Sequence, residues 1–453
     1  MSLKNLGQKI TGLFNIKIEE NKFLKIQTKN NAEKVFAKHV GEYLSGESFN
    51  AGALNLEYNK LRKNFTKSFE KYINNLCFGE KNFKIDNASD LFFANNKTSV
   101  TQFETYFACP YRFFFKYGLR LKENKVAKLS SLDVGTLIHK FVEIFTDRIN
   151  EFEDLSDEEF DRRAKEIFDE TLTMLSINKK KNVAIISFVL GECVRLAKYL
   201  FEEQCASSFK NDSKLNEFEF KGKNAIKIPI DENKVILVEG KIDRIDKFGD
   251  YIRIIDYKTG ETSSDLSSIY FGKKIQLVSY LSACESFENK KVAGLLYFPI
   301  HSEFVKIEQK IKNNYKMEGF LLNDIQVIKY MDSSLSLDNS ESRYVPIKLQ
   351  TNTDVQKTGE LKIADGRTKV FMSAEEFENV KRYSKQLCRQ AAIEILDGNI
   401  APAPFAKQSE RESGLCEYCE LSGFCGKEHA RFGAARRCLG KVELSSFDKE
   451  GEN

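Results

Sequence analysis

Residues 235–258, near the middle of the chain, constrain the fold more than any other stretch. Apolar and charged residues alternate along them, and the polar break Lys247-Phe248-Gly249-Asp250 divides them in two. Alternation around such a break is typical of a β-hairpin. We expect a first arm that ends at Asp246 and a second arm that begins at Tyr251.

In this register the hairpin brings two carboxylates together. If Asp246 pairs with Tyr251, then Asp243 and Asp256 are diagonal neighbours on one face, with Cβ atoms within roughly 7 Å of each other. Lys258 follows Asp256 by two residues and projects from the same face. Neighbouring carboxylates repel each other unless a cation lies between them, so this face is predicted to bind a metal ion.

Segments with helical periodicity flank the hairpin in the sequence. Residues 132–207 precede it and residues 275–283 follow it, while residues 292–300 have the composition of another strand. Residues 374–396 are also expected to be helical. We therefore predict an α/β fold, in which these helices flank a central mixed sheet. Residues 1–95 are expected to be a helical accessory segment, residues 96–440 the main domain, and residues 441–453 a flexible tail.

Three polar side chains on the flanking helices could reach the hairpin. His139 ends the segment Gly135-Thr136-Leu137-Ile138-His139 near the start of a predicted helix. A single helical histidine is more often structural than a ligand, so the pattern alone leaves its role open. Gln276 and Tyr280 are i,i+4 neighbours on one face of the later helix.

The charge distribution is more informative than the total. The 453-residue chain has a formal net charge of only +4, but residues 96–130 hold seven Lys or Arg against two Glu, and residues 421–441 hold five against one. Such patches are typical of a surface that follows a polyanion, although a solvated face has the same composition. No run of about 18 apolar residues and no signal peptide is present, so we expect a cytoplasmic protein.

Residues 99–117 combine a helix start with rings and cations. Thr101 followed by Glu104 has the spacing of a capping box, and Pro110 is expected to break that helix. Arg112, Lys116 and, just beyond the segment, Arg120 are candidate nucleic-acid contacts beside aromatic rings. A buried aromatic cluster with Arg and Lys stems packed along it explains the same pattern equally well.

Cysteines near the C-terminus have a metal-binding spacing. Cys416, Cys419 and Cys425 form C-x2-C-x5-C, in which two thiolates two residues apart can hold one ion. Cys109, next to Pro110, is a candidate for the fourth ligand. Zinc and an iron–sulfur cluster both fit four cysteines, and the spacing does not decide between them.

Taken together, these motifs resemble the RecB-like group of PD-(D/E)XK nucleases. The sequence has Cys-Pro-Tyr at 109–111, GTLIH, GKIDRID, IIDYKTG, QLVSYL and the terminal C-x2-C-x5-C in the same order as that group. The similarity covers roughly residues 96–440 and is greatest to the C-terminal nuclease region of AddB proteins, which are subunits of bacterial AddAB helicase–nucleases.

The resemblance implies a restriction-endonuclease-like fold and a role for each residue of the site. It implies Mg²⁺ or Mn²⁺ bound by His139, Asp243, Asp256 and the carbonyl of Tyr257. Lys258 is expected to orient or activate water, or to stabilise charge. The resemblance also implies support from Gln276 and Tyr280, a further acidic residue at Glu217 or less surely Glu219, and a [4Fe–4S] cluster, clasping the rim of the domain, on Cys109, Cys416, Cys419 and Cys425.

The implied function is DNA degradation, by a single-strand exonuclease that acts in double-strand-break processing and recombinational repair with a helicase subunit resembling AddA. No G-x-x-x-x-G-K-[ST] occurs, so no ATPase site is predicted, and residues 1–95 would be a remnant of an upstream helicase-like region. The alternatives are an inactive iron–sulfur scaffold that binds DNA and a stand-alone nuclease of the CRISPR-adaptation type. Strand polarity, exonuclease or endonuclease action, oligomeric state and the natural start of the chain stay open.

Overall fold

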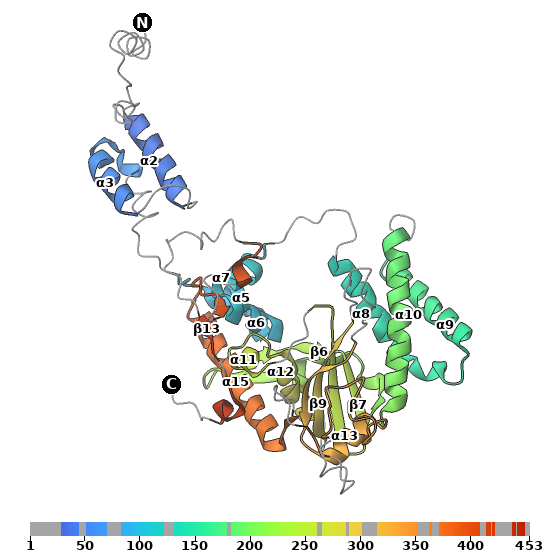
Figure 1. Ribbon diagram of the computed structural model, residues 1–453. Coiled ribbons are helices and arrows are strands. Elements are labelled where there is room, and N and C mark those ends of the chain that lie inside the picture. Colours follow the sequence, from blue (N-terminus) through green and yellow to red (C-terminus); the bar gives the residue numbers. More distant parts are fainter. Residues whose placement is uncertain are drawn as a thin grey trace.

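A computed structural model gives the architecture of the chain (Figure 1). It describes residues 29–44, 51–69, 83–121, 131–178, 183–260, 265–286, 290–300, 315–350, 362–364, 371–407, 414–417, 419–421, 437–440 and 442–448. None of the described helices is long and apolar enough to cross a membrane.

A six-stranded mixed sheet forms the centre of the molecule, as the alternation pattern predicts. Its strand order is β11-β10-β9-β8-β7-β2. The central pair β8 and β9 is parallel, and β7 lies antiparallel to β8. The strands are β2 (Lys210–Asn211), β7 (Arg244–Phe248), β8 (Tyr251–Lys258), β9 (Lys291–Pro299), β10 (Glu318–Leu322) and β11 (Phe371–Met372).

The hairpin forms, but its predicted register is wrong by two residues. Phe248 pairs with Tyr251 and Asp246 pairs with Arg253, so Gly249 and Asp250 alone make the turn. Gly249 adopts φ 52°, which costs glycine little. Phe248 continues the strand because its ring packs 4.4 Å from that of Tyr330. A shift of two residues preserves the alternation of faces, so the predicted facing of each side chain survives.

The predicted first arm, residues 235–246, is not one strand. It is divided into β5 (Val235–Val238), β6 (Gly240–Ile242) and β7, which belong to three different sheets. β5 pairs with β1 (Lys97–Thr98) and β4 (Ile226–Pro229), and β6 pairs with β3 (Phe218–Phe220). Gly240 lets β6 lie close to β3, because a Cβ there would lie 2.5 Å from the Phe220 ring. Asp243 occupies the bend between β6 and β7.

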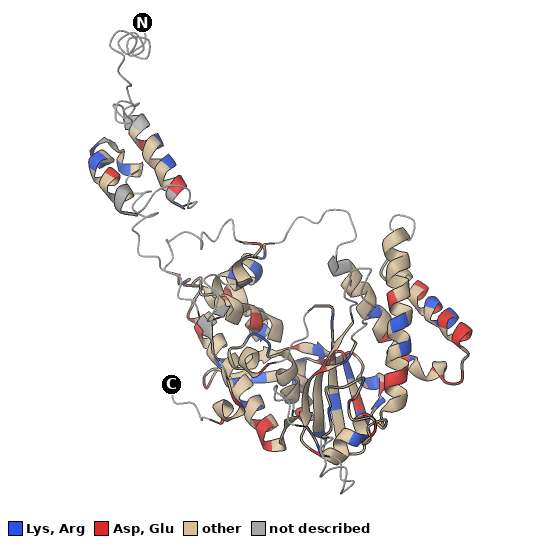
Figure 2. Ribbon diagram, in the orientation of Figure 1, with Lys and Arg blue, Asp and Glu red and all other residues tan. Residues whose placement is uncertain are grey.

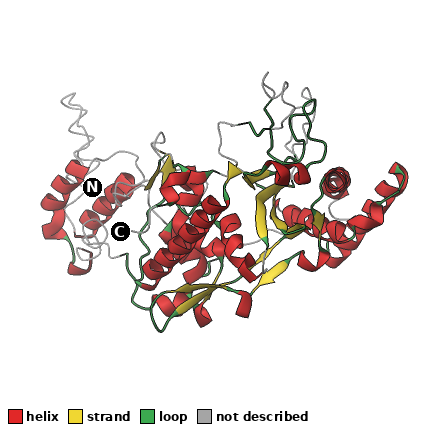
Figure 3. Cartoon of the chain, turned by 90° about the horizontal axis from the view of Figure 1, so that it is seen from below, coloured by secondary structure: helices red, strands yellow, loops and turns green. Residues whose placement is uncertain are grey.

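Helices cover both faces of the central sheet (Figures 1 and 3). One apolar core joins the sheet to the three helices α8 (Ser131–Asp147), α9 (Asp157–Met174) and α10 (Val183–Ala206). The other core joins it to α6 (Val100–Ala108), α12 (Gln276–Ala283) and α15 (Ala374–Leu396). Side chains of β8 alternate between them: Ile254 packs in the second core and Ile255 in the first. The predicted helices 132–207, 275–283 and 374–396 are therefore confirmed.

Local sequence explains where these helices begin. Ser156 and Glu159 form a capping box at the start of α9, and Ser373 and Glu376 form one at α15. The predicted capping box at Thr101 is wrong: Ser99 caps α6 through the backbone N–H of Gln102. The outer face of α9 alternates acidic and basic residues, which is typical of a solvated surface (Figure 2).

Shorter elements complete the described chain. The pair α2 (Lys29–Leu44) and α3 (Ala51–Leu61) buries a separate small apolar cluster around Phe36. The other short elements are α5 (Ala88–Phe92), α7 (Pro110–Phe113), α11 (Leu266–Tyr270), α13 (Ile325–Met331), α16 (Gly414–Glu417), β12 (Phe405–Lys407) and β13 (Arg437–Leu439).

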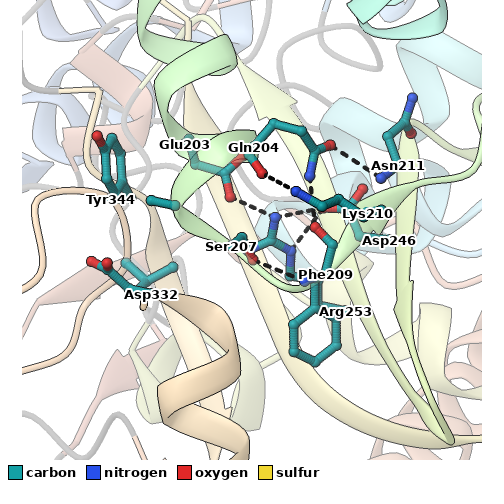
Figure 4. Close-up of polar contacts among 12 residues, drawn as sticks. Glu203, Gln204, Ser207, Phe209, Lys210, Asn211, Asp246, Arg253, Asp332 and Tyr344 are labelled. Atoms are coloured by element: carbon teal, nitrogen blue, oxygen red, sulfur yellow. Dashed lines mark hydrogen bonds and ion pairs between the residues drawn. The ribbon is translucent and has the colours of Figure 1, made fainter. Parts of the chain in front are cut away.

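A buried cluster of four charges joins α10 to the hairpin. Arg244, Asp246 and Arg253 are 0% exposed and Glu203 is 1% exposed. The Nε atoms of both arginines donate to Asp246, each at 2.7 Å, and Arg253 also donates to Glu203 at 2.5 Å. Figure 4 shows Arg253 between Asp246 and Glu203. Two cations and two carboxylates balance, so the cluster fixes α10 against β7 and β8 without net buried charge.

We predict that Asp246→Ala destabilises the fold by about 3–5 kcal/mol, because it leaves two buried guanidinium groups without their shared carboxylate. Urea denaturation followed by far-UV circular dichroism measures the change. Asp250→Ala is the matched control, since that side chain is 82% exposed at the hairpin turn, and it should cost less than about 0.5 kcal/mol. Equal effects of the two substitutions would contradict the prediction.

Candidate active site

His139 reaches the hairpin from the first turns of α8. Gly135, one turn earlier, lies against the end of β8: a Cβ there would be 3.3 Å from the methyl group of Thr259. The absence of a side chain at Gly135 therefore lets the helix approach the strand end. The ring of His139 packs edge-on against that of Tyr257, with centroids 5.8 Å apart.

Asp243 lies between His139 and the strand. Its Oδ2 is 3.2 Å from Nε2 of His139 and accepts a hydrogen bond from the backbone N–H of Tyr257 at 2.8 Å. Burial alone lowers the pKa of His139, but the hydrogen bond and charge of Asp243 outweigh it, so the pKa is raised. The imidazole is thus held against a carboxylate in the arrangement that a shared cation would use.

Glu217 completes a three-residue cluster. Ligand atoms of His139, Glu217 and Asp243 all lie within 4.8 Å of one another. The backbone N–H of Glu217 donates to the carbonyl of Asp243 at 2.9 Å, and Glu217 adopts φ 54°, an unusual conformation for a residue with a side chain. Glu217 also pairs with Lys241, and Glu219, the other candidate, pairs with Lys221. Of the two acidic residues, Glu217 is the one beside His139 and Asp243.

Asp256 and Lys258 form the adjacent part of the site. Asp256 is 1% exposed, its Oδ1 accepts from Tyr280 Oη at 3.0 Å, and its Oδ2 lies 2.5 Å from Lys258 Nζ. Gln276 links the helix to both, since its Oε1 accepts from Lys258 Nζ at 2.8 Å and its Nε2 donates to Tyr280 Oη at 2.6 Å. The predicted residues Gln276 and Tyr280 therefore contact the lysine and the carboxylate directly.

Asp256 has an unusual protonation equilibrium. Burial, followed by repulsion from Asp243, raises its pKa to about 6, and the opposing effects of Lys258 and Tyr280 do not cancel this. Among the described residues, the set within 4.8 Å does not include Asp256. Both of its oxygens are instead held by Lys258 and Tyr280.

This geometry agrees with the comparisons to known proteins. A family model described as the PD-(D/E)XK nuclease superfamily matches residues 97–426. The chain belongs to the PD-(D/E)XK nuclease superfamily. Asp243 lies on the bend that leads into β7, and Asp256 and Lys258 lie on β8, all within the matched range.

Curated relatives share the match over most of this chain. A protein from Ruminiclostridium cellulolyticum, named as a subunit of an ATP-dependent helicase/deoxyribonuclease, is 30% identical over 356 residues, which are 72% of this chain and 29% of that protein. A protein of the same name from Oceanobacillus iheyensis is 28% identical over 401 residues, covering 81% of this chain and 33% of the relative. The chain thus spans about a third of the length of these relatives.

The cysteines of the predicted clasp are partly brought together. Cys109, at the end of α6, is buried, and Cys416 and Cys419 are half-buried; all three are free thiols. Burial raises the pKa of Cys109, and Cys416 is close enough to raise it further. Cys416 likewise adds to the effect of burial in raising the pKa of Cys419. Cys425 lies outside the described residues.

The candidate nucleic-acid contacts have mixed surroundings. Arg112 makes a two-pronged ion pair with Glu420, at 3.1 and 2.9 Å, and so joins the segment of Cys109 to that of Cys419. Lys116 lies 5.2 Å from the centre of the Tyr117 ring, and Arg120 is exposed with φ 53°. Many neighbouring rings, such as Phe113 at 1% exposure, are buried, as the alternative interpretation of this segment expects.

Glu104 is a residue of the site that the sequence patterns missed. Its carboxylate accepts hydrogen bonds from the backbone N–H groups of Ile275 and Gln276, at 2.8 and 3.0 Å. Its spacing from Thr101 indicates instead a role within its own helix. No local pattern signals a contact with a segment 171 residues later.

We predict that Asp256→Asn stabilises the metal-free protein at pH 8 by about 1–3 kcal/mol, because it removes a buried charge that Asp243 repels. The folded-state pKa lies above the unfolded value, so the stabilisation from protonation is complete below about pH 4 and is lost as the pH rises through 6. The substituted protein should lack this decline.

Urea titrations in EDTA at pH 4.5, 6 and 8 measure both effects. Asp250→Asn, at the exposed turn, is the control and should follow the wild type at every pH. A loss of stability on Asp256→Asn at pH 8 would show that the carboxylate is stabilising even without metal.

Proposed function

We propose that this chain is a metal-dependent DNA nuclease that hydrolyses phosphodiester bonds of single-stranded ends. The observation that carries the proposal is the cluster of His139, Glu217 and Asp243 within 4.8 Å, directly beside Asp256 and Lys258. Structural ion pairs do not need an imidazole, three carboxylates and a lysine at one strand end. A phosphodiester hydrolase does, because it must hold a cation and stabilise a negatively charged transition state.

The donor set fits a hard divalent cation. Carboxylate oxygens and one imidazole suit Mg²⁺ or Mn²⁺, and His139, Glu217 and Asp243 would hold the ion, with Asp256 and the carbonyl of Tyr257 as further ligands. When bound, such an ion polarises the phosphodiester and lowers the pKa of a coordinated water. Burial raises the pKa of Asp256 and repulsion from Asp243 adds to this; a nearby cation would relieve that repulsion.

The other residues of the site position the reacting groups. Lys258 points its ammonium group at the site and would stabilise negative charge on the phosphate or orient the attacking water. Gln276 holds that ammonium group, and Tyr280 fixes Asp256 by a hydrogen bond, so neither reacting group has to be ordered when substrate arrives.

The partners we propose are DNA and a separate helicase subunit resembling AddA. The relatives are named as subunits of an ATP-dependent helicase/deoxyribonuclease, which supports a multisubunit helicase–nuclease acting in double-strand-break repair. We retain residues 96–440 as the nuclease domain and residues 1–95 as an accessory segment. The predicted flexible tail 441–453 does not fit residues 444–447, a short 3-10 helix whose Leu444 and Phe447 are buried in the core shared with α15. Lys116 and Arg120 are the proposed phosphate contacts, whereas Arg112 is engaged by Glu420 and would act mainly in shaping that surface.

For the cysteines we propose a [4Fe–4S] cluster on Cys109, Cys416, Cys419 and Cys425. Support comes from Cys416, which lies close to Cys109 although it follows it by more than 300 residues, and which is also close to Cys419. The Arg112–Glu420 ion pair holds the same two segments together. Such a cluster would clasp the two ends of the domain rather than take part in hydrolysis.

We predict that Lys258→Ala lowers the single-turnover rate at least about 100-fold, because one cation aimed at the developing charge is lost. The assay uses a 5′-labelled single-stranded oligonucleotide with Mg²⁺. Lys329→Ala, on the exposed face of α13, is the control and should match the wild type. Equal degradation by wild type and Lys258→Ala would assign the activity to a contaminant.

We predict that Cys419→Ser abolishes visible absorbance and bound iron and sulfide in anaerobically purified protein, and lowers thermal stability. Cys205→Ser, an exposed thiol far from the clasp, is the control and should leave all three unchanged. Stoichiometric zinc without iron in the wild type would overturn the choice of cluster and leave a four-cysteine zinc site.

A further inference from the structure

The first turn of α12 receives its cap from a distant part of the chain. The residue before the helix, Ile275, has no side chain that could accept a hydrogen bond from the free N–H groups. Ile275 is also fully buried, so water does not replace the missing acceptor. Oε1 of Glu104 supplies it, accepting from the N–H of Ile275 at 2.8 Å and from that of Gln276 at 3.0 Å.

The same turn holds the reacting groups. Gln276, whose backbone Glu104 binds, accepts from Lys258 Nζ at 2.8 Å. One turn later, Tyr280 donates to Asp256 at 3.0 Å. A displacement or rotation of the first turn of α12 would therefore move the partners of Lys258 and Asp256 together.

We propose that Glu104 is a positioning residue, which sets Lys258 and Asp256 by fixing the first turn of α12. The inference rests on the proposed nuclease function and adds to it a group that contacts neither substrate nor metal. Glu104 takes no part in capping its own helix, because Ser99 caps α6. Its carboxylate can therefore bind α12. α6 itself is held to α15 by the hydrogen bond from Tyr106 to Glu394, at 2.9 Å.

The geometry requires an acceptor oxygen at the right reach rather than a negative charge. One oxygen accepts both hydrogen bonds, and an uncharged carbonyl oxygen can do the same. Burial raises the pKa of Glu104 to about 7, so the carboxyl is neutral in a substantial fraction of molecules near neutral pH. Reach and charge can therefore be separated by substitution.

Three variants make that separation. Glu104→Gln keeps the reach and the acceptor oxygen but has no charge. Glu104→Asp keeps the charge but is one methylene shorter. Glu104→Ala has neither. Phe103→Leu is the matched control, because it loosens the packing of the neighbouring buried residue of α6 and leaves the carboxyl in place.

We expect kcat on a single-stranded oligonucleotide with Mg²⁺ to fall about 10- to 100-fold for Glu104→Ala and Glu104→Asp, with KM within about twofold. Glu104→Gln should stay within about threefold of the wild type. In a Gln276→Ala background, Glu104→Ala should cost little more, because both act through the same turn. Phe103→Leu should lower thermal stability without this loss of kcat.

The opposite order, Asp active and Gln inactive, would overturn the proposal in favour of a charge effect. So would full additivity of Glu104→Ala with Gln276→Ala, or a loss of stability with kcat unchanged.

Amide hydrogen exchange gives a readout that does not need activity. Exchange at residues 275 and 276 should be about 10-fold faster in Glu104→Ala than in the wild type and unchanged in Glu104→Gln. An inactive wild type that shows this exchange pattern would refute the nuclease function and leave the capping contact. If the wild type is active but substitution of Glu104 changes neither exchange nor kcat, the positioning role alone would be refuted.

Discussion

Burial of charged side chains on both faces of one strand governs this structure. β8 carries Arg253 toward α10 and Asp256 toward α12, and both are at most 1% exposed. A buried charge is tolerated when partners surround it. α10 therefore has to bring Glu203, and α12 has to bring Tyr280. Partners for these two residues come from a helical layer on each side of the sheet, and the candidate active site lies where the layers meet the end of the strand.

The cluster of charged residues around Arg253 and the one around Asp256 have different roles. In the cluster around Arg253 the charges of two cations and two carboxylates balance, and the cluster holds α10 against the hairpin. The group around Asp256 holds the further negative charge of Asp243, which adds to burial in raising the pKa of Asp256. Buried charged side chains thus hold a helix in place on one face of β8, and on the other face they form a site that a bound cation would neutralise. Retention of His139, Asp243, Asp256 and Lys258 together argues against an inactive scaffold.

Periodicity and motif order predict much of this arrangement. The helices of residues 132–207, 275–283 and 374–396 and the strands β8 and β9 follow from local patterns that folding does not override. The register of the hairpin does not follow from local patterns, because the packing of Phe248 on Tyr330 decides where the turn begins. Local patterns also fail to predict that the first arm is divided among three sheets, since this division depends on contacts of Gly240 and Asp243 with distant residues.

Long-range backbone contacts are the least predictable part of the site. Glu104 has a spacing that suits a local cap, yet Ser99 takes that role and Glu104 binds α12. Only the resemblance to the nuclease family suggests Glu217, whose position depends on an unusual φ and a backbone hydrogen bond to Asp243. Sequence patterns indicate which residues repeat along an element, not which carbonyl or amide they meet across the molecule.

The position of His139 has a consequence for how the site assembles. Asp243, Asp256, Lys258, Gln276 and Tyr280 lie within 38 consecutive residues, whereas His139 precedes Asp243 by 104. The strand and α12 are close in the sequence, whereas the imidazole reaches the site only through the long-range packing of α8 on the sheet. Under the proposed function, the metal site would therefore be complete only in the folded chain, and a partly folded chain would lack the proposed nuclease activity.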